Sequence, residues 1–505
     1  IKTATVAIGL AAAVFGANVT ITTATVGQWS TAVAALQAGD TLTLAPGNYT
    51  NQATPSTDLI PKGLSNAGTA EKRIVIRAAA KNTVFIRARG EWISVSKPYY
   101  TFENLDIDGS GGVHAFHIKP GGAYCIIRNC HFSGIANSPI KLSTEVGKER
   151  QDYLVFENNE CERSSGPIYS SVLNGFNLNG ANFVVVRGNY IHEIAKSYAQ
   201  PFYEHNDAYG GFMKAGAKYG IIENNIVKYI NGMGLSLGGG TTAEQYFSEG
   251  TYPVEAMGCV MRNNVIVGFP NRNFGNRAFT INHGNGNLVY NNTFVNCINP
   301  AIFGKTWVLN PITGDSVMTG VGNIVMNNLS VNMFWADSAW ATQFGYSSGG
   351  TLTDGIQFVW STWSNFNPAF DGIIKARNAV LGNQRIDVAN LNDLFFNADS
   401  NDFRLKPSGL HYVKAAAKVD SATVAGLAAP LKSVSGTKTS RDAGFIDSLI
   451  SKGLIAQYFD KAGNVRPAVP APGAYEAYDE QGRIVNVTTA LENSNLSRSS
   501  VSINS

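Results

Sequence analysis

The middle of the chain repeats a short phrase in which apolar and polar residues alternate and the alternation ends at asparagine. Each copy predicts a strand, because Val, Ile, Phe and Tyr alternate with polar residues before an Asn-Asn or Gly-Asn turn signal. Successive copies lie 25 to 39 residues apart, which is typical of one repeating unit with insertions in its loops. The aligned turn positions are Asn104, Asn129, Asn158, Gly188, Asn224, Asn263, Asn291 and Asn327.

A second strand-like segment follows each copy, and the two together predict a solenoid. A strand with one apolar face cannot bury that face alone, so stacked repeats must build the core. We therefore predict an all-β fold, a right-handed parallel β-helix with long loop insertions and an irregular C-terminal region. One interior column is predicted to hold Phe116, Ile140, Phe176, Phe212, Leu235, Phe279 and Ile302, and a second to hold Ile118, Leu142, Leu178, Leu237 and Ile281.

The asparagines at the recurrent turn have a structural interpretation. Asn tolerates the left-handed backbone that such turns need, and equivalent residues of stacked coils lie about 4.8 Å apart. We expect these residues to adopt that backbone and to stack as a hydrogen-bonded ladder.

The two ends of the chain depart from the repeat and define three segments. Residues 1–17 are hydrophobic, which is typical either of a cleaved secretory signal or of an element that caps the first coil or mediates assembly. Residues 18–410 are predicted to form the β-helix. Residues 411–505 are predicted to form a C-terminal extension with a closing coil and a polar tail.

Composition narrows the class of protein. A chain of 505 residues with 52 Gly, 15% charged residues and 44% hydrophobic residues fits a secreted or cell-surface all-β protein. It has no stretch suited to a stable membrane span and no basic run or motif for nucleic acid. The five cysteines leave at least one thiol unpaired within the chain, and none has the spacing of a zinc or haem site.

Both ends of the repeat carry a resemblance to a known family. The segments ATVGQWSTAVAALQAGDTLTLAPGNYTN (24–51) and EKRIVIRAAAKNTVFI (71–86) resemble the first coils of secreted β-helix proteins of the chondroitinase B and alginate lyase type. DFRLKP (402–407) and the later DKAGNVRP and PGAYE are similar to the last coils of many secreted β-helix proteins. The resemblance implies β-elimination on a uronic-acid polysaccharide, with a Lys as base, a neighbouring Arg and a calcium ion.

The catalytic pattern of that family matches this chain only in part. Lys214 stands where the family's base would be, and Asp207 matches an acidic calcium ligand, with Glu204 as a second candidate. Tyr209 stands in place of a further acid, and Ser236-Leu237-Gly238 replaces the expected Arg-containing phrase. Asn282-His283-Gly284, one coil further on, is a candidate for a displaced counterpart. The predicted catalytic residues are Lys214, His283 and Arg277, with Arg272 an alternative to Arg277.

Lys214 is also unusual by its place in the repeat alone. The phasing puts it in the interior column between Leu178 and Leu237, where an unpaired ammonium would be costly. Three readings stay open. The strand shifts by one residue at a bulge and turns Lys214 outward, Lys214 is buried and paired, or it is an ordinary solvated lysine.

Two long inserts and the outward positions of one strand column suggest a binding face for an anionic glycan. The inserts, 195–210 and 238–256, are rich in Tyr, Phe, Glu and His, and loops on a rigid scaffold commonly carry binding residues. A plain solvated sheet face explains the outward positions equally well. The predicted substrate-binding residues are Glu204, His205, Tyr209, Tyr246, Lys119, Lys141, Asn179, Asn282 and Lys305, beside outward His117 and Asn177.

Three functions from different classes remain open on the sequence. The first is a polysaccharide lyase, and the second is a non-catalytic glycan-binding or adhesive β-helix. The third is a structural subunit that self-associates through the N-terminal segment or the solenoid ends, where strand edges must be covered.

Overall fold

The fold is that of a computed structural model, which describes residues 16–50, 64–87, 91–109, 113–162, 173–194, 208–269, 277–333, 351–360, 371–433 and 445–484, with short gaps inside these ranges. Two compact units make up the chain: Ile1–Ile221 with Asn225–Glu255, and Ile222–Asn224 with Ala256–Ser505. The predicted N-terminal segment lies outside the described residues, apart from its last two residues.

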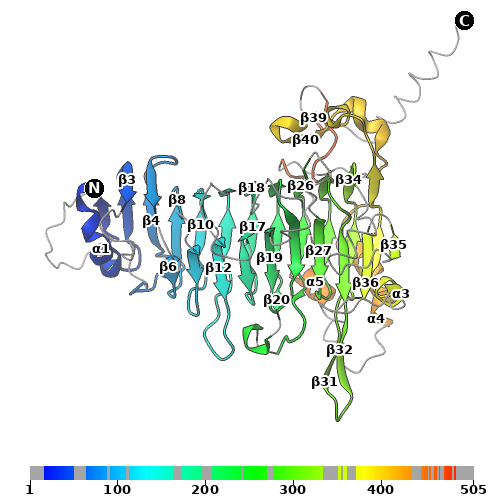
Figure 1. Ribbon diagram of the computed structural model, residues 1–505, viewed down its shortest axis with the longest axis horizontal. Coiled ribbons are helices and arrows are strands. Elements are labelled where there is room, and N and C mark those ends of the chain that lie inside the picture. Colours follow the sequence, from blue (N-terminus) through cyan, green and yellow to red (C-terminus); the bar gives the residue numbers. More distant parts are fainter. Residues whose placement is uncertain are drawn as a thin grey trace, which may run out of the picture. The chain divides into compact units, whose positions relative to one another are not determined.

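The first unit consists of coils that each give one strand to three parallel sheets (Figure 1). A short 3-10 turn, η1 (Thr23–Gln28), and the helix α1 (Trp29–Ala35) lie near its N-terminal end. Sheet A contains, in order, β1 (Asn18–Ile21), β2 (Thr41–Leu44), β4 (Ile74–Ala78), β7 (Tyr100–Glu103), β10 (Ile126–Arg128), β13 (Val155–Glu157) and β17 (Val185–Arg187). Sheet B contains β3 (Gly47–Thr50), β5 (Val84–Arg87), β8 (Asp106–Asp108), β11 (His131–Ser133), β14 (Glu160–Glu162), β18 (Tyr190–His192) and β22 (Ile226–Lys228).

Sheet C of the first unit carries the residues of interest for function. It contains β6 (Glu91–Val95), β9 (His114–Ile118), β12 (Ser138–Ser143), β16 (Asn177–Asn179), β19 (Ala208–Lys214) and β23 (Gly232–Gly238), and the short β15 (Leu173–Asn174) also pairs with β19. The short strands β20 (Ala217–Lys218) and β21 (Ile221–Glu223) and the turn η3 (Glu244–Tyr246) complete this region.

The second unit repeats the same plan and adds hairpins and helices. In this unit sheet A contains β25 (Val260–Arg262), β28 (Leu288–Tyr290), β33 (Ile324–Met326) and β37 (Ala379–Leu381). Sheet B contains β26 (Val265–Val267), β29 (Thr293–Val295), β34 (Leu329–Val331) and β38 (Gln384–Ile386). Sheet C contains β27 (Arg277–Asn282), β30 (Ala301–Gly304) and β36 (Ile356–Trp360), and β35 (Thr351–Thr353) pairs antiparallel with β36. The additions are hairpins β31 (Thr306–Asn310)–β32 (Asp315–Met318) and β39 (Phe395–Asn397)–β40 (Asp402–Leu405), strand β24 (Ala256–Met257), helices α3 (Asp371–Ala376), α4 (Ser421–Ser433) and α5 (Phe445–Ser451), and short turns η5 to η7.

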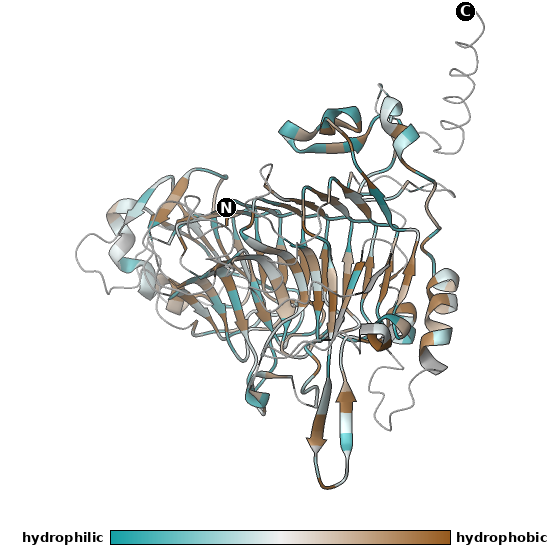
Figure 2. Cartoon of the chain, turned by 45° about the vertical axis from the view of Figure 1, so that its right-hand side comes forward, coloured by the Kyte–Doolittle hydropathy of each residue, from teal (hydrophilic) through white to brown (hydrophobic). Residues whose placement is uncertain are grey.

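Parallel pairing of successive coils confirms the right-handed parallel β-helix. Apolar and polar residues alternate along the strands (Figure 2), and the apolar members are buried inside the coils. Among the described residues no helix is long and apolar enough to cross a membrane.

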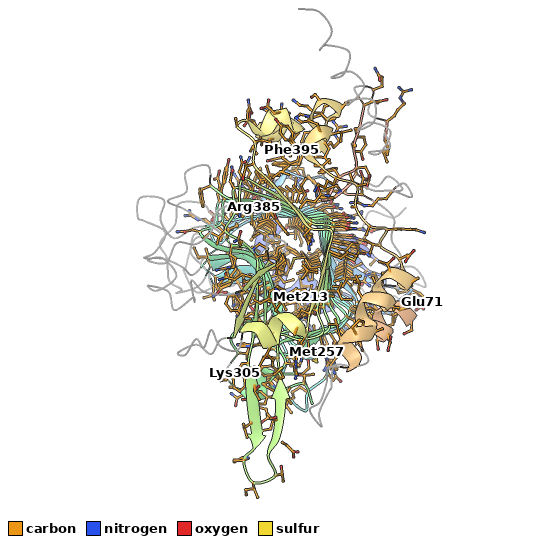
Figure 3. The ribbon with its side chains drawn as sticks, turned by 90° about the vertical axis from the view of Figure 1, so that its right-hand side faces the viewer. Glu71, Met213, Met257, Lys305, Arg385 and Phe395 are labelled. Atoms are coloured by element: carbon orange, nitrogen blue, oxygen red, sulfur yellow. The ribbon has the colours of Figure 1, made fainter. Side chains whose placement is uncertain are left out.

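The interior of sheet C corrects two positions of the predicted columns. On β19 the register pairs Met213 with Leu178, so Met213 lies in the interior (Figure 3). It pairs Phe212 with Asn177, which places Phe212 on the outer face. The prediction that Phe212 joins the interior stack is therefore wrong. Ile302 also changes column, because it pairs with Ile281.

Two consecutive glycines explain the wrong prediction on β19. Gly211 takes the interior position between Phe176 and Leu235, with φ of +157°. A Cβ at Gly211 would lie 2.2 Å from the Phe176 ring, so only glycine leaves room for that ring. Because Gly211 takes the interior position, the next residue, Phe212, faces outward.

We expected one asparagine at each turn both to adopt the left-handed backbone and to form the hydrogen-bonded ladder. In the structure two neighbouring residues share these roles. Asn104, Asn129 and Asn158 adopt positive φ. The following residue makes the side-chain hydrogen bonds: Asn159 Nδ2 donates to Asn189 Oδ1 at 3.1 Å, and Asn189 Nδ2 donates to Asn225 Oδ1 at 2.9 Å. In the second unit the equivalent chain joins Asn264, Asn292, Asn328 and Asn383.

The five cysteines are all free and buried. Burial raises the pKa of the Cys125 thiol to about 11 and that of Cys130 to about 12, so both thiols stay protonated at neutral pH. Cys125, Cys130, Cys161, Cys259 and Cys297 therefore act as small apolar residues of the core.

Candidate active site on the outer face of sheet C

Four polar side chains form a row across the outer face of sheet C. The register pairs Ser143 with Asn179 and Asn179 with Lys214, and the pairing of Leu142 with Ile118 places Lys119 beside Ser143. Parallel strands are about 4.8 Å apart, so the row spans roughly 15 Å. We call Lys119, Ser143, Asn179 and Lys214 the outer row.

Lys214 lies at one end of the outer row and is neither solvated nor in the core. Its Nζ lies 4.7 Å from the centroid of the Phe212 ring, and its aliphatic stem packs on Gly239, where a Cβ would come within 2.6 Å of Cδ. Burial lowers the pKa of Lys214, and the charge of Glu255 opposes that shift only in part. Among the described residues no carboxylate comes within ion-pair distance of Lys214. The register of β19 runs without a shift, so no bulge turns this lysine outward. Lys214 lies on the outer face because Met213, and not Lys214, pairs with the interior Leu178 and Leu237.

Glu255 anchors the loop that covers this end of the row. Its Oε2 accepts the backbone N–H of Ala215 at 2.7 Å, and its Oε1 accepts the N–H of Thr241 at 2.5 Å. Burial raises the pKa of Glu255. The sequence analysis missed Glu255, although an acid within the apolar stretch Pro253–Met257 is a signal that could have drawn attention to it.

Lys141 adds a second cation, and no ion pair joins it to an acid of the described residues. It pairs in register with His117 on one side and Asn177 on the other, on the same face as the outer row. Burial lowers its pKa, and the charge of Lys214 lowers it further. Two lysines that repel each other on one face favour the binding of an anion between them.

Glu91, His117 and Lys119 form a hydrogen-bonded cluster at the other end. His117 Nδ1 lies 2.6 Å from Glu91 Oε1, and Lys119 Nζ donates to Glu91 Oε2 at 3.1 Å. Burial by itself would raise the pKa of Glu91, but these two bonds outweigh it and hold that pKa at about 2. Glu91 precedes the recurrent phrase in the chain, and the sequence analysis did not single it out.

The predicted catalytic residues of the second unit have local partners. Arg277 is buried, and its Nη1 donates to Asn299 O at 2.7 Å and to Gln357 Oε1 at 3.0 Å. His283 Nδ1 lies 3.0 Å from Thr319 Oγ1, and burial lowers the pKa of His283 to about 4. Their catalytic roles stay predictions.

Two predicted binding residues also belong to the second unit. Lys305 lies just before hairpin β31–β32 (Figure 3), with its Nζ 4.0 Å from the centroid of a Trp307 ring. Asn282 pairs in register with Phe303. Their roles in binding likewise stay predictions.

The insert residues are divided between described and undescribed segments. Tyr209 is the second residue of β19, and its ring meets the Phe212 ring edge-on at 5.3 Å. Tyr246 is exposed on the loop before Glu255. Glu204, His205, Asp207 and Arg272 lie outside the described residues. Within the described ranges no group of three or more His, Cys, Asp or Glu side chains could hold a metal ion.

Comparison with known proteins finds similarity in solved structures alone, since neither a protein-family model nor a curated protein matches the sequence. A mannuronic acid specific polysaccharide family 6 lyase from human gut microbiota is 14% identical over 63% of this chain and 66% of that chain, with a TM-score of 0.39. A rhamnogalacturonan lyase is 15% identical over 74% and 86%, with a TM-score of 0.40. Pectate lyase Pel9A is 14% identical over 89% and 90%, with a TM-score of 0.39.

These solved structures are polysaccharide lyases. Because the identities and TM-scores are this low, the function of the chain has to be inferred from its own residues.

Proposed function

We propose that this chain binds an anionic, uronate-containing polysaccharide on the outer face of sheet C and cleaves it by β-elimination outside the cell. The observation that supports this proposal best is Lys214. It is a half-buried lysine with a lowered pKa, and it lies at the end of a polar row without an ion-pair partner among the described residues.

A lysine in this setting is suited to act as a general base. Lowering the pKa raises the fraction of neutral amine at working pH, and only the neutral amine can accept a proton. In the proposed step Lys214 Nζ takes the proton from C5 of the uronate. The electron pair forms the C4–C5 double bond, and the bond from C4 to the leaving oxygen breaks. The leaving oxygen takes a proton from water, and Lys214 returns the proton that it removed to the solvent.

The charge of the face supports an anionic substrate. Lys141 on β12 and Lys214 on β19 lie on one sheet, and Lys119 directly follows its strand β9; among the described residues the acids beside them are Glu91 and Glu255. Glu91 is engaged by His117 and Lys119, and Glu255 by backbone N–H groups. A carboxylate of the substrate would therefore be the natural partner of Lys141 and Lys214.

We also propose that a calcium ion takes part, with ligands among residues outside the described ranges. Carboxylates such as Asp207 and Glu204 are suitable calcium ligands, and an ion held there would neutralise the substrate carboxylate. No step above runs through a metal.

The test is an elimination assay on alginate, chondroitin sulfate, dermatan sulfate and pectate, which follows the ultraviolet absorbance of the unsaturated uronate. Lys214→Ala should lower the rate by about 10²–10⁴-fold, as loss of a general base does. Lys228→Ala is the matched control, because Lys228 on sheet B also lies over an aromatic ring, at 4.9 Å from the Tyr229 centroid.

Two outcomes would contradict this proposal. One is unchanged activity in Lys214→Ala. The other is binding of these glycans by the native chain without any unsaturated product, which would favour a non-catalytic glycan-binding β-helix.

A further inference from the structure

A chain of hydrogen bonds crosses three strands of sheet C from Ser143 to Glu91. Ser143 Oγ lies 3.0 Å from His117 Nε2, and His117 Nδ1 lies 2.6 Å from Glu91 Oε1. The three residues come from β12, β9 and β6, each displaced along the strand from the last, so that the side chains meet on a diagonal.

The hydrogen bonds fix the proton positions in this chain. A carboxylate only accepts, so His117 Nδ1 carries the proton that it donates to Glu91. His117 Nε2 then has a free lone pair and accepts the hydroxyl proton of Ser143. Burial lowers the pKa of His117, which keeps the ring neutral, while the pKa of Glu91 is held at about 2, which keeps that carboxyl ionised.

We propose that Ser143, His117 and Glu91 form a nucleophile, base and orienting carboxylate that hydrolyse carboxylic esters, such as O-acetyl groups, on an anionic saccharide. The geometry meets the requirement for an activated serine, since nucleophile and base are within hydrogen-bond reach and a third group orients the base. Ser143 is half exposed at the end of β12, so an ester can approach its Oγ.

Asn179 provides the group that such chemistry needs beside the nucleophile. It pairs in register with Ser143, so the two Cβ atoms lie about 5 Å apart. Its Oδ1 is buried and accepts no hydrogen bond from the described residues, so no described hydrogen bond to this oxygen fixes the orientation of the amide. In the proposed reaction the amide turns its Nδ2 toward Ser143 and donates to the oxyanion that forms when Ser143 attacks.

The proposed reaction is balanced with water as the only co-reactant. Ser143 Oγ attacks the carbonyl carbon while its proton passes to His117 Nε2. The bond from that carbon to the sugar oxygen then breaks, and His117 returns the proton to the sugar hydroxyl. Water attacks the acyl-serine with His117 as base, which releases the carboxylic acid and restores Ser143.

The saccharide part of this proposal uses the same cationic face, but the ester chemistry is independent of Lys214. Ester hydrolysis releases acetate, whereas β-elimination produces an unsaturated uronate. Failure of one activity is therefore visible separately from failure of the other.

The first experiment is covalent labelling of the full chain with a fluorophosphonate, followed by peptide mapping. Ser143 should be labelled, and His117→Ala should reduce the labelling rate at least about 10²-fold, as removal of a general base does. Ser133→Ala is the matched control, because Ser133 also ends a strand and is half-buried, but on sheet B.

The second experiment measures hydrolysis of p-nitrophenyl acetate and acetate release from acetylated alginate and acetylated pectin. Ser143→Ala should abolish both activities. The thiol introduced by Ser143→Cys should react with iodoacetamide faster when His117 is present than when His117→Ala is combined with it. Glu91 acts through His117 as a positioning residue, so Glu91→Gln should lower kcat with little change in KM.

The proposal is overturned if no label reaches Ser143, or if Ser143→Ala hydrolyses the esters at the native rate. Equal alkylation of Ser143→Cys with and without His117 would likewise show that the three residues only hold the sheet together.

Discussion

Two outer faces of the first unit treat their charged residues in opposite ways. On sheet A, Glu103 lies between Arg77 at 3.6 Å and Arg128 at 2.7 Å, and Glu157 pairs with Arg187 at 2.7 Å. On sheet C, Lys141 and Lys214 have no ion pair within the described ranges. Stacked coils can pair their charges easily, so a face that leaves lysines unpaired is a candidate for binding something else.

The histidines of sheets B and C also differ in their pKa values. On sheet B a hydrogen bond with Asp106 raises the pKa of His131 to about 9, and Glu162 lies 3.2 Å away on the other side. On sheet C burial lowers the pKa of His114 to about 4 and also lowers that of His117. His131 on sheet B is therefore favoured as a cation in an ion pair, whereas His114 and His117 on sheet C are favoured as neutral rings.

The largest expected effect is a loss of stability in Phe176→Ala that Phe212→Ala does not share, and it tests whether Phe212 lies on the outer face of sheet C. Phe176→Ala should cost about 3–5 kcal/mol in the free energy of unfolding, because it leaves a cavity in the core. Phe212→Ala should cost clearly less, because the outer face can relax around the change. Urea unfolding of both variants measures this, and equal losses would return Phe212 to the interior column.

A smaller effect separates the paired face from the unpaired one. Glu103→Gln should cost about 1–2 kcal/mol, since it weakens the hydrogen bonds from Arg128 and removes the ion pair with Arg77, both partly exposed arginines. Lys141→Met should change stability by less than about 0.5 kcal/mol or raise it, because no described ion pair is lost. Urea unfolding of the two variants in the same buffer compares them, and a larger loss in Lys141→Met would contradict the contrast.

The smallest effect is the opposite pH dependence of two histidines. His131 has a raised pKa, so its contribution is fully present below about 6.5 and is lost as pH rises through about 9. His114 has a lowered pKa, so its contribution is present above about 6.5 and is lost as pH falls through about 4.

Melting temperatures measured between these pH values give the test. The native chain should lose melting temperature as pH rises from about 6.5 to about 9, and His131→Asn should make that loss smaller. It should also lose melting temperature as pH falls from about 6.5 to about 4, and His114→Asn should make that loss smaller. The same change of profile in both variants would contradict the contrast between sheets B and C.

The repeat predicted the order of the coils, but it could not predict which residues face the interior where a strand contains glycine. Interior columns followed from alternation wherever apolar residues marked every second position, as at Phe116 and Ile118. Alternation failed at Gly210–Gly211, because glycine carries no side chain that marks a face, so the alignment placed Phe212 and not Gly211 in the interior column. Lys214 was recognised as unusual, but its direction depended on which residue of β19 takes that interior position.

The diagonal from Ser143 to Glu91 could not be predicted from the chain. It depends on the register among β6, β9 and β12, and a shift of one residue on any strand would separate the three side chains. His117 and Lys119 were recognised as outward residues. Their acid partner Glu91 lies in a segment that lacks the recurrent phrase, so no alignment of repeats points to it.

The most direct measurement is the affinity of a uronate oligosaccharide for variants of the two faces, measured by titration calorimetry in a Lys214→Ala background that prevents cleavage. Lys141→Ala should weaken binding about tenfold, which corresponds to the loss of roughly 1.4 kcal/mol from one charged contact. Arg187→Ala, on the paired face of sheet A, should leave the affinity unchanged. Equal weakening by both variants, or weakening by Arg187→Ala alone, would contradict the assignment of sheet C as the polysaccharide-binding face.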